Sequence, residues 1–318
     1  MSTVSRYLNG HSVSNSAKEQ ISRAIARLNY TPSSTARNLS LGRRGIIGVV
    51  VDSMFDPWLA QLLGSIEEEL SMQHTSLMIA TLEQEGNYSP DVVFQWIRKR
   101  RVDGLIIAKS KKRRHSVLHA AIEAKLPVVT VAPDETVQQA QVICCNNIAA
   151  GMAVADHLAN LGHREIAFVG GPAHSISSEN RLRGLRNRLR EWGISLNPKI
   201  TEFCGSYEAE AGLEFARVLL AKPLQVTALV MANDALALGF MKAAQQHGIR
   251  IPQDLSIVGF DNVREGALVW PRLTTMSQPI LDMGRTACRT LFQSVYSPVD
   301  FEKIEFPMTL VVRESTAE

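Results

Sequence analysis

The feature that most constrains the fold is a regular alternation, from residue 46 onward, of short apolar runs with longer segments of helical periodicity. The run IIGVVV at 46–51 is continuous, β-branched and too short for a helix, which predicts a strand buried on both faces. The segment 56–74 follows with apolar residues at helical spacing behind an Asp-Pro start signal. Because buried strands that alternate with helices form parallel sheets, a doubly wound α/β fold is predicted.

The alternation occurs as two series. The first continues with expected strands at 76–81, 102–108 and 127–132 and expected helices at 91–100 and 116–125. The second has expected helices at 149–162, 179–193, 208–221 and 234–248, with expected strands at 165–171, 199–203, 227–232 and 255–261. Two similar parallel-sheet subdomains are therefore predicted, with a ligand cleft between them at the carboxyl ends of the strands.

The loops at that edge carry residues suited to binding. Arg181 could clamp hydroxyls or a carboxylate, while the pairs Asn233-Asp234 and Asp261-Asn262 offer donors and acceptors. Flat faces for a sugar or a base could come from Phe55, Trp58 and Tyr207. Ordinary roles stay open for single residues, such as a helix cap for Asp234, a surface ion pair for Arg181 and core packing for Trp58.

Motifs of catalysis are missing from the sequence. No G-x-G-x-x-G follows a strand, no phosphate loop ends in Gly-Lys-Ser/Thr, and no G-x-S-x-G elbow occurs. The eight histidines do not fall at metal-ligand spacing. We therefore expect a protein that is not an enzyme, with no catalytic residue, no metal and no cofactor.

The net charge of +3 divides into two opposed parts. Residues 1–45 hold seven Lys or Arg against one acid, Glu19, and the other 273 residues hold 27 basic and 30 acidic groups. A basic arm on a mildly acidic body is typical of nucleic-acid binding, although a solvated basic segment would look the same.

Cysteine usage and hydropathy indicate the compartment. The four cysteines form no C-x-x-C pair and are too irregular for a disulfide framework, which favours a reducing setting. No apolar stretch approaches the roughly 20 residues that a membrane-spanning helix needs, and the N-terminus has no signal-like apolar region. We expect a cytoplasmic protein with no membrane partner.

Several motifs together resemble one known family. TVSRYLNG and NYTPSSTARNLSLGRRGIIGVVV near the N-terminus, then HLANLGHREIAFVGGP, MANDALALG, IPQDLSIVGFDN and PRLTT, follow in order through the chain. Over essentially its whole length the chain resembles the lac repressor (LacI/GalR) family of bacterial transcription regulators.

The resemblance implies a domain organisation. Residues 1–32 would form a partial all-α helix-turn-helix headpiece, with a helix opened by a capping box at Ser16, and residues 33–45 a hinge helix or linker. Residues 46–318 would form the effector-binding and dimerisation domain, similar to periplasmic binding proteins. Its N-subdomain would span about 46–144 plus 275–303, and its C-subdomain about 145–274 plus 304–318.

The resemblance also implies roles for particular residues. The DNA-binding residues would be Thr3, Ser5 and Arg6 in the major groove and Leu39, beside Ala36, Arg37 and Asn38, in the minor groove. The effector-binding residues would be Asp52, Phe55, Trp58, Arg181, Tyr207, Asn233, Asp261 and Gln278.

These roles imply a DNA-binding transcription regulator, in most such proteins a repressor, whose affinity for a palindromic operator in double-stranded DNA is set by a small, carbohydrate-like effector. The partner subunit would be a second copy, in a homodimer or a tetramer. Met1 falls at the start of the family's recognition helix, so the helix before it has no counterpart here. Either the true start lies upstream, which we expect, or the chain is a small-molecule-binding module without DNA-binding activity.

Overall fold

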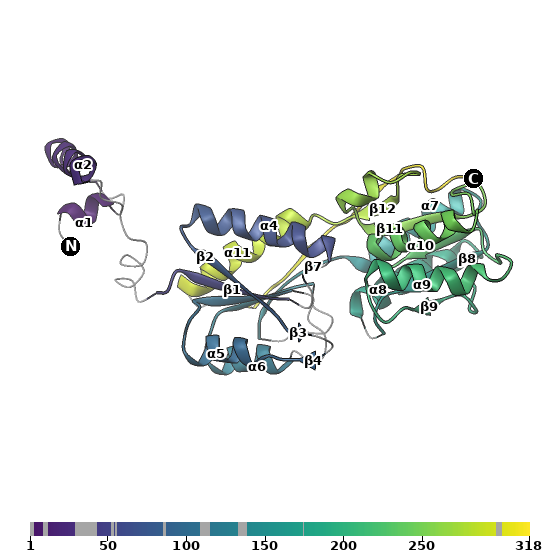
Figure 1. Cartoon of the computed structure of the whole chain (residues 1–318), viewed down its shortest axis with the longest axis horizontal. Helices are drawn as coiled ribbons and strands as arrows, with labels where there is room; N and C mark the ends of the chain where they lie inside the picture. The colour runs from purple at the N-terminus through teal and green to yellow at the C-terminus, as the bar shows by residue number, and fades with distance from the viewer. Residues whose placement is uncertain are drawn as a thin grey trace.

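The computed structural model describes residues 3–8, 12–28, 43–51, 54, 56–84, 87–108, 115–132, 139–173, 175–296 and 301–318. Two subdomains follow one another along the long axis of the molecule, each a mainly parallel sheet covered by helices on both faces (Figure 1). The predicted fold class, two doubly wound α/β subdomains behind a short helical segment, is therefore confirmed. No helix in these ranges is long and apolar enough to cross a bilayer.

The first subdomain is built on a six-stranded sheet whose neighbouring strands all run parallel. In sheet order the strands are β13 (Lys303–Phe306), β7 (Gln141–Cys145), β6 (Val128–Val131), β5 (Gly104–Ala108), β1 (Ile46–Val51) and β2 (Ser76–Thr81). Helices α4 (Pro57–Met72) and α11 (Ile280–Tyr296) pack together over one face, and α5 (Asp91–Arg98) and α6 (His115–Glu123) over the other.

The second subdomain repeats this plan. Its sheet runs β14 (Thr309–Val311), β12 (Thr274–Ser277), β11 (Ser256–Asp261), β10 (Ala228–Met231), β8 (Ile166–Gly170) and β9 (Glu202–Phe203), with β14 the one antiparallel strand in it. Its helices are α7 (Asn147–Asn160), α8 (Ile176–Glu191), α9 (Ala209–Leu220) and α10 (Asp234–Gln246), and they pack as the pairs α7–α8 and α9–α10. A 3-10 turn, η2 (Arg264–Ala267), follows β11. In the first subdomain, a short hairpin of β3 (Glu83–Gln84) and β4 (Asn87–Tyr88) follows β2 in the chain.

The chain crosses between the subdomains at three places. The connections are 145–147, 277–280 and 306–309, each beginning where a strand of one sheet ends. The boundaries expected from the sequence, at about 144, 274 and 303, lie within three residues of these connections. Cys145 and residues 304–306 belong to the first sheet, and residues 275–277 to the second, because each strand continues to the cleft before the chain leaves its sheet.

Several elements were not anticipated. Strands β7, β12, β13 and β14 and helix α11 were not recognised, and the strand expected at 199–203 is reduced to Glu202–Phe203. The missed strands β13 and β14 lie at sheet edges and contain no fully buried residue, so they lack the continuous apolar run of a covered strand.

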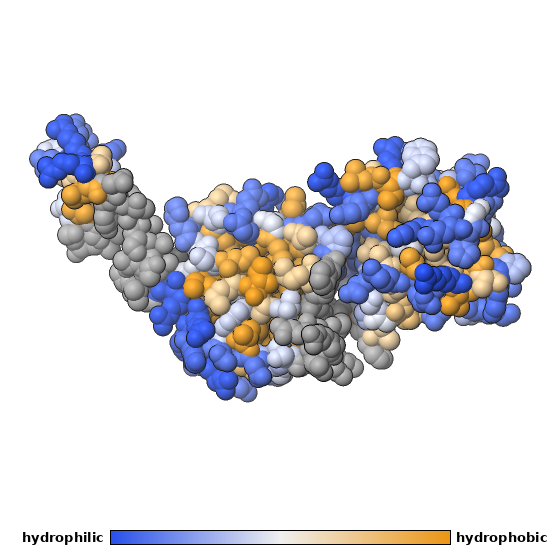
Figure 2. Space-filling view, viewed as in Figure 1, coloured by the Kyte–Doolittle hydropathy of each residue, from blue (hydrophilic) through white to orange (hydrophobic). Residues whose placement is uncertain are grey.

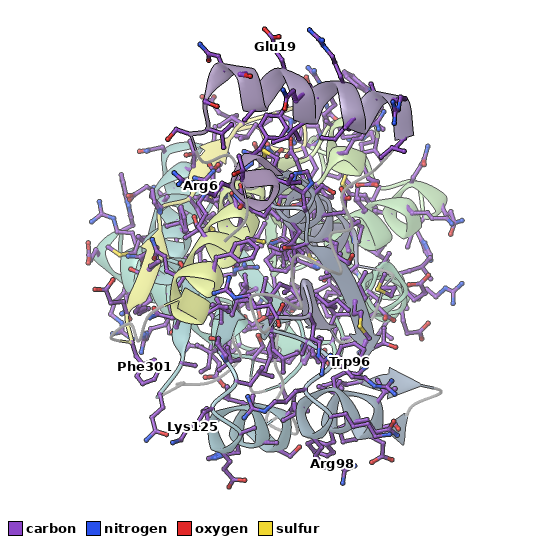
Figure 3. The ribbon with its side chains drawn as sticks, turned by 90° about the vertical axis from the view of Figure 1, so that its left-hand side faces the viewer. Arg6, Glu19, Trp96, Arg98, Lys125 and Phe301 are labelled. Atoms are coloured by element: carbon purple, nitrogen blue, oxygen red, sulfur yellow. The ribbon has the colours of Figure 1, made fainter. Side chains whose placement is uncertain are left out.

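The N-terminal segment contains helices α1 (Thr3–Leu8) and α2 (Asn15–Leu28), which touch each other through a hydrogen bond of 2.7 Å between Tyr7 Oη and Ser22 Oγ. The cap of α2 lies at Ser14 and not at Ser16, since Ser14 Oγ accepts a hydrogen bond from the Ala17 amide. None of the α2 residues is fully buried, and Glu19 points away from the body of the molecule (Figure 3).

Candidate functional site

A cavity of about 360 Å³ lies between the two subdomains, at the carboxyl ends of their strands. It is lined from the first subdomain by α4 and β7, from the second by α7, α8 and β11, and by the connection 277–280. Six residues that the family resemblance assigned to the effector lie together on its walls: Trp58, Arg181, Tyr207, Asn233, Asp261 and Gln278. The cleft predicted from the alternation of strands and helices is thus a real cavity with polar walls.

Arg181 is held by contacts on several sides of its guanidinium. It is 5% exposed, on α8, so the open alternative of a surface ion pair was wrong. Its Nε donates to Asn147 Oδ1 at 2.8 Å and its Nη1 to the Ala232 carbonyl, while Nη2 lies 3.8 Å from Asp261 Oδ1. The guanidinium also stacks over the Phe260 ring, 4.5 Å from its centroid. Contacts on this many sides fix the orientation of the guanidinium before a ligand arrives.

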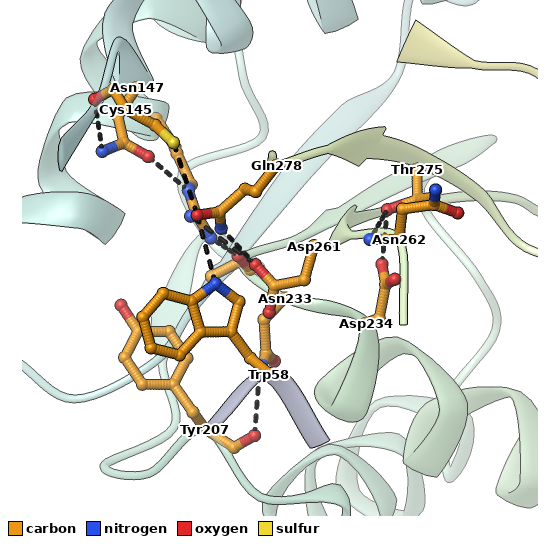
Figure 4. A network of polar contacts seen from close by, with 12 residues as sticks. Trp58, Cys145, Asn147, Tyr207, Asn233, Asp234, Asp261, Asn262, Thr275 and Gln278 are labelled. Atoms are coloured by element: carbon orange, nitrogen blue, oxygen red, sulfur yellow. Dashed lines mark hydrogen bonds and ion pairs between the residues drawn. The ribbon is translucent and has the colours of Figure 1, made fainter. Parts of the chain in front are cut away.

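Asp261, at the end of β11, has a backbone conformation that few residues adopt. Its φ is 120° and that of Asn262 is 59°, so the chain turns sharply at the cleft. Asp234 supports this turn: its carboxyl oxygens accept hydrogen bonds from the Val263 amide at 2.9 Å and from Thr275 Oγ1 at 2.6 Å. Figure 4 shows Asp234 on the side of the turn away from the cleft.

Asp234 therefore does not line the cavity, and it is not the helix cap. The cap of α10 is Asn233, whose Oδ1 accepts from the Leu236 amide at 3.0 Å. Burial, with a smaller contribution from the charge of Asp261, raises the pKa of the Asp234 carboxyl well above its ordinary value.

Tyr207 presents a fixed aromatic ring to the cavity. Its hydroxyl is hydrogen-bonded to Ser175 Oγ at 2.6 Å and to Ser178 Oγ at 2.9 Å, and its carbonyl accepts from Asn233 Nδ2 at 3.0 Å. The ring lies against Gly171, where an added Cβ would come within 2.4 Å of it. The glycine that directly follows β8 leaves the space in which the Tyr207 ring lies.

Trp58 belongs both to the hydrophobic core of the first subdomain and to the wall of the cavity. Its side chain is fully buried, so the core-packing role is real, yet its Nε1 donates to Gln278 Oε1 at 3.2 Å beside the cavity (Figure 4). The Cys145 thiol also donates to Gln278 Oε1, at 3.6 Å. Burial raises the pKa of Cys145 to about 12, so this thiol is a poor nucleophile.

Two predicted effector residues, Asp52 and Phe55, lie outside the described residues. Asn147 was not singled out from the sequence, although its Oδ1 holds Arg181. A signal existed, because Asn146-Asn147 follow the run QVICC, which is strand β7. In the described ranges no group of three or more His, Cys, Asp or Glu residues could hold a metal ion.

Among the DNA-binding residues suggested by the resemblance, Thr3, Ser5 and Arg6 lie on α1. Thr3 and Arg6 are exposed, and Arg6 Nη2 donates to the Ser12 carbonyl at 3.2 Å in the turn before α2. Ala36, Arg37, Asn38 and Leu39 lie outside the described residues. The structure therefore contains the helix pair α1–α2 of the expected headpiece, whereas the four expected hinge residues fall outside the described ranges.

Comparison with known proteins agrees with this architecture. The family model for a "Periplasmic binding protein-like domain" matches residues 155–316. The ribose operon repressor of Haemophilus influenzae is 33% identical over 99% of this chain and 94% of its own length. The HTH-type transcriptional repressor PurR of Mannheimia succiniciproducens is 30% identical over 98% of this chain and 94% of its own length.

Solved structures extend the comparison to the cleft and the headpiece. The lac repressor dimer bound to operator and the anti-inducer ONPF superposes with a TM-score of 0.81 at 27% identity, over 99% of this chain and 95% of that one. A LacI family regulator of Enterococcus faecium with bound ribose gives a TM-score of 0.75 at 25% identity, over 86% of this chain and 98% of that one.

Fold, cleft and relatives together define a transcription regulator with a periplasmic-binding-protein-like core. The chain belongs to the LacI/GalR family of transcription regulators, a family of repressors that respond to sugars or other metabolites and not a family of enzymes.

Proposed function

We propose that this protein represses transcription from a palindromic operator and that an uncharged, ribose-like sugar in the cleft between the subdomains sets its affinity for that operator. The observation that carries the proposal is the pairing of the buried Arg181 with Asp261 on the cavity wall, next to Trp58 and Tyr207. A guanidinium and a carboxylate side by side offer donors and acceptors to neighbouring hydroxyls, while their charges balance.

The charge balance favours a neutral ligand. An anionic ligand at Arg181 would also meet the carboxylate of Asp261, with its Oδ1 3.8 Å from the same guanidinium. The ring of Tyr207 gives a sugar a flat apolar face to lie against. The two sugar-related relatives, the ribose operon repressor and the ribose-bound regulator, support the choice of ribose as the first ligand to test.

Control of DNA binding follows from linkage. Two headpieces bind an operator tightly only at a fixed half-site spacing. A ligand that closes the cleft more tightly in one state than in the other shifts that spacing, with a typical coupling of about 1–3 kcal/mol. We place Thr3, Ser5 and Arg6 in the major groove and Leu39 in the minor groove, in a cytoplasmic protein.

A homodimer would supply the two headpieces. Trp270 and Leu268, in the segment after η2, are 79% and 71% exposed, and Met72 at the end of α4 is 60% exposed. Figure 2 has apolar surface over the β1, β2 and α4 region of the first subdomain and again near β12 of the second. Exposed apolar groups along both subdomains are suited to a second copy of the chain.

The experiment has two steps. DNA fragments that bind the purified protein are selected from random duplexes, and binding of the selected site is then titrated with D-ribose by fluorescence anisotropy. We expect a palindromic site and a change in affinity of about 5–150-fold. D-ribose should also raise the melting temperature, since it binds the folded state. Stabilisation by D-ribose without any selected DNA would mean that the chain is a small-molecule-binding module, and no response to D-ribose would refute the proposed ligand.

A further inference from the structure

Gln278 occupies an unusual position among the cavity residues. It lies in the connection between β12 of the second subdomain and α11 of the first, and its side chain is 9% exposed. Figure 4 shows it between Trp58 and Cys145 on one side and Asp261 on the other. A residue in a connection between two subdomains can act on their relative arrangement as well as on a ligand.

The two ends of its amide are bonded to different subdomains. Gln278 Oε1 accepts from Trp58 Nε1 at 3.2 Å and from the Cys145 thiol at 3.6 Å, both in the first subdomain. Gln278 Nε2 donates to Asp261 Oδ1 in the second. The orientation of the amide is unambiguous, because an indole N–H requires an acceptor and a carboxylate requires a donor.

The bonded atoms are also those that a ligand would meet. Trp58 and Asp261 both line the cavity, and the same Asp261 oxygen lies 3.8 Å from Arg181 Nη2. A ligand hydroxyl that bonds Asp261 therefore alters the partners of the amide on one side of the cleft, while Trp58 holds the amide on the other.

From these contacts we infer that Gln278 is a latch that links the two subdomains across the cleft and limits how far they open. It acts as a positioning residue, through Trp58 and Asp261, and requires no contact of its own with the ligand. The inference rests on the proposed function only in taking closure of the cleft as the response to a ligand.

Substitutions at position 278 separate the two ends of the latch. Gln278→Met keeps a similar length and volume but removes both the acceptor and the donor. Gln278→Glu keeps an acceptor for Trp58 and loses the donor, so a second carboxylate faces Asp261. Trp58→Phe removes the indole donor on the first subdomain and leaves the amide bonded to Asp261. The matched controls are Gln245→Met and Gln245→Glu, at an exposed glutamine of α10.

The test measures the distance between the subdomains without any ligand. Azidophenylalanine replaces Val92 on α5 and Val218 on α9, both exposed, and carries two dyes for single-molecule energy transfer in the full chain. For Gln278→Met we expect a distribution of inter-dye distances at least twice as wide as in the parent protein and extended toward longer distances. Gln278→Glu should extend it further, Trp58→Phe should act in the same direction, and the Gln245 variants should match the parent.

A distribution for Gln278→Met and Trp58→Phe that superimposes on the parent would overturn the latch, whatever Gln278→Glu does to folding. A circular-dichroism melt of each variant confirms that the chain is folded before its distances are compared. D-ribose added to the parent protein tests the proposed function separately: if the sugar leaves the distances unchanged while Gln278→Met widens them, the latch stands and the sugar proposal fails.

Discussion

At the scale of the residue, the cleft is organised around one buried cation. Arg181 contacts Asn147 at the start of α7, the Ala232 carbonyl after β10 and Asp261 at the end of β11, and so joins three separate segments of the second subdomain. The planar fork of a guanidinium serves several acceptors at once, which the single ammonium of lysine does not do in the same geometry.

Arg181→Lys should therefore weaken D-ribose binding about tenfold or more while the protein stays folded. A hydrogen bond to a charged group contributes roughly 1.5–3 kcal/mol, and lysine keeps the charge but loses part of the fork. Isothermal titration with D-ribose measures the change. Arg217→Lys, at an exposed arginine of α9, is the control and should bind as the parent does. Equal affinity of the two variants would contradict the role of Arg181.

At the scale of the element, the second subdomain depends on close helix packing. Gly151 of α7 and Gly184 of α8 face each other's helices, and a Cβ at Gly184 would lie 2.0 Å from the Ile148 carbonyl oxygen. That oxygen belongs to backbone and cannot swing aside. Since α8 carries Arg181, the same contact sets the depth of the guanidinium in the cleft.

Gly184→Ala should lower the free energy of unfolding by at least about 1–3 kcal/mol, the usual cost of overpacking. Gly64→Ala is a matched control, because Gly64 lies inside α4 with nothing within 4 Å of an added Cβ. That change should leave stability unchanged or raise it by about 0.5–1 kcal/mol. Urea denaturation of both variants measures the difference, and a Gly184→Ala protein as stable as Gly64→Ala would show that the helices can separate freely.

The pairing of β12 with β14 predicts an acid-dependent part of the stability. Arg272 lies just before β12, and Glu314 lies just after β14. Arg272 Nε donates a hydrogen bond to Glu314 Oε2 at 2.8 Å. The side-chain hydrogen bond from Arg272 is the main cause that lowers the pKa of Glu314 to about 2. The depressed pKa means that the pair stabilises the fold at pH values above 4.5, the ordinary value for this group, and that this contribution is lost as the pH falls toward 2.

Glu314→Gln should accordingly flatten the dependence of the unfolding free energy on pH between pH 4.5 and pH 2. Near neutral pH the variant should differ from the parent by a constant free energy, with the same dependence on pH. Denaturant titrations at a series of acidic pH values measure the slope. Arg272→Gln should also flatten the slope, because the side-chain hydrogen bond from Arg272 is the main cause that lowers the pKa of Glu314. A slope identical to that of the parent in both variants would mean that the pair does not titrate with folding.

At the scale of the whole molecule, positive charge is concentrated in the N-terminal arm. Binding of selected operator DNA should weaken as salt rises, and replacement of Arg6, Arg37 and Arg43 by glutamine should lower the slope of log K against log salt by about three, one for each phosphate contact. Replacement of Arg186, Arg217 and Arg250, which are exposed in the second subdomain, removes the same charge and should leave the slope unchanged. Equal slopes for the two triple variants would contradict the assignment of the arm.

Much of this molecule was readable from local pattern. The apolar runs predicted strands β1, β2, β5, β6, β8, β10 and β11, because strands covered by helices on both faces must be apolar along their length. Strands β13 and β14 escaped recognition because their residues are exposed or only half-buried, so their sequences lack the continuous apolar run of a covered strand. The chemistry of the cleft was also readable in part, from polar residues at the ends of predicted strands.

The sequence by itself determined the two-sheet plan, the family and the cavity residues at or near the end of a strand, such as Asn233 and Asp261. The tertiary structure decided which of these side chains meet: Asp234 lies below the turn and not in the cleft, Asn147 holds Arg181, and Gln278 links the two subdomains. The reason is physical. Secondary structure depends on periodicity over a few residues. The partners of a buried polar group can lie far apart in the sequence, as Trp58 and Gln278 do at a separation of 220 positions, and only packing brings them together.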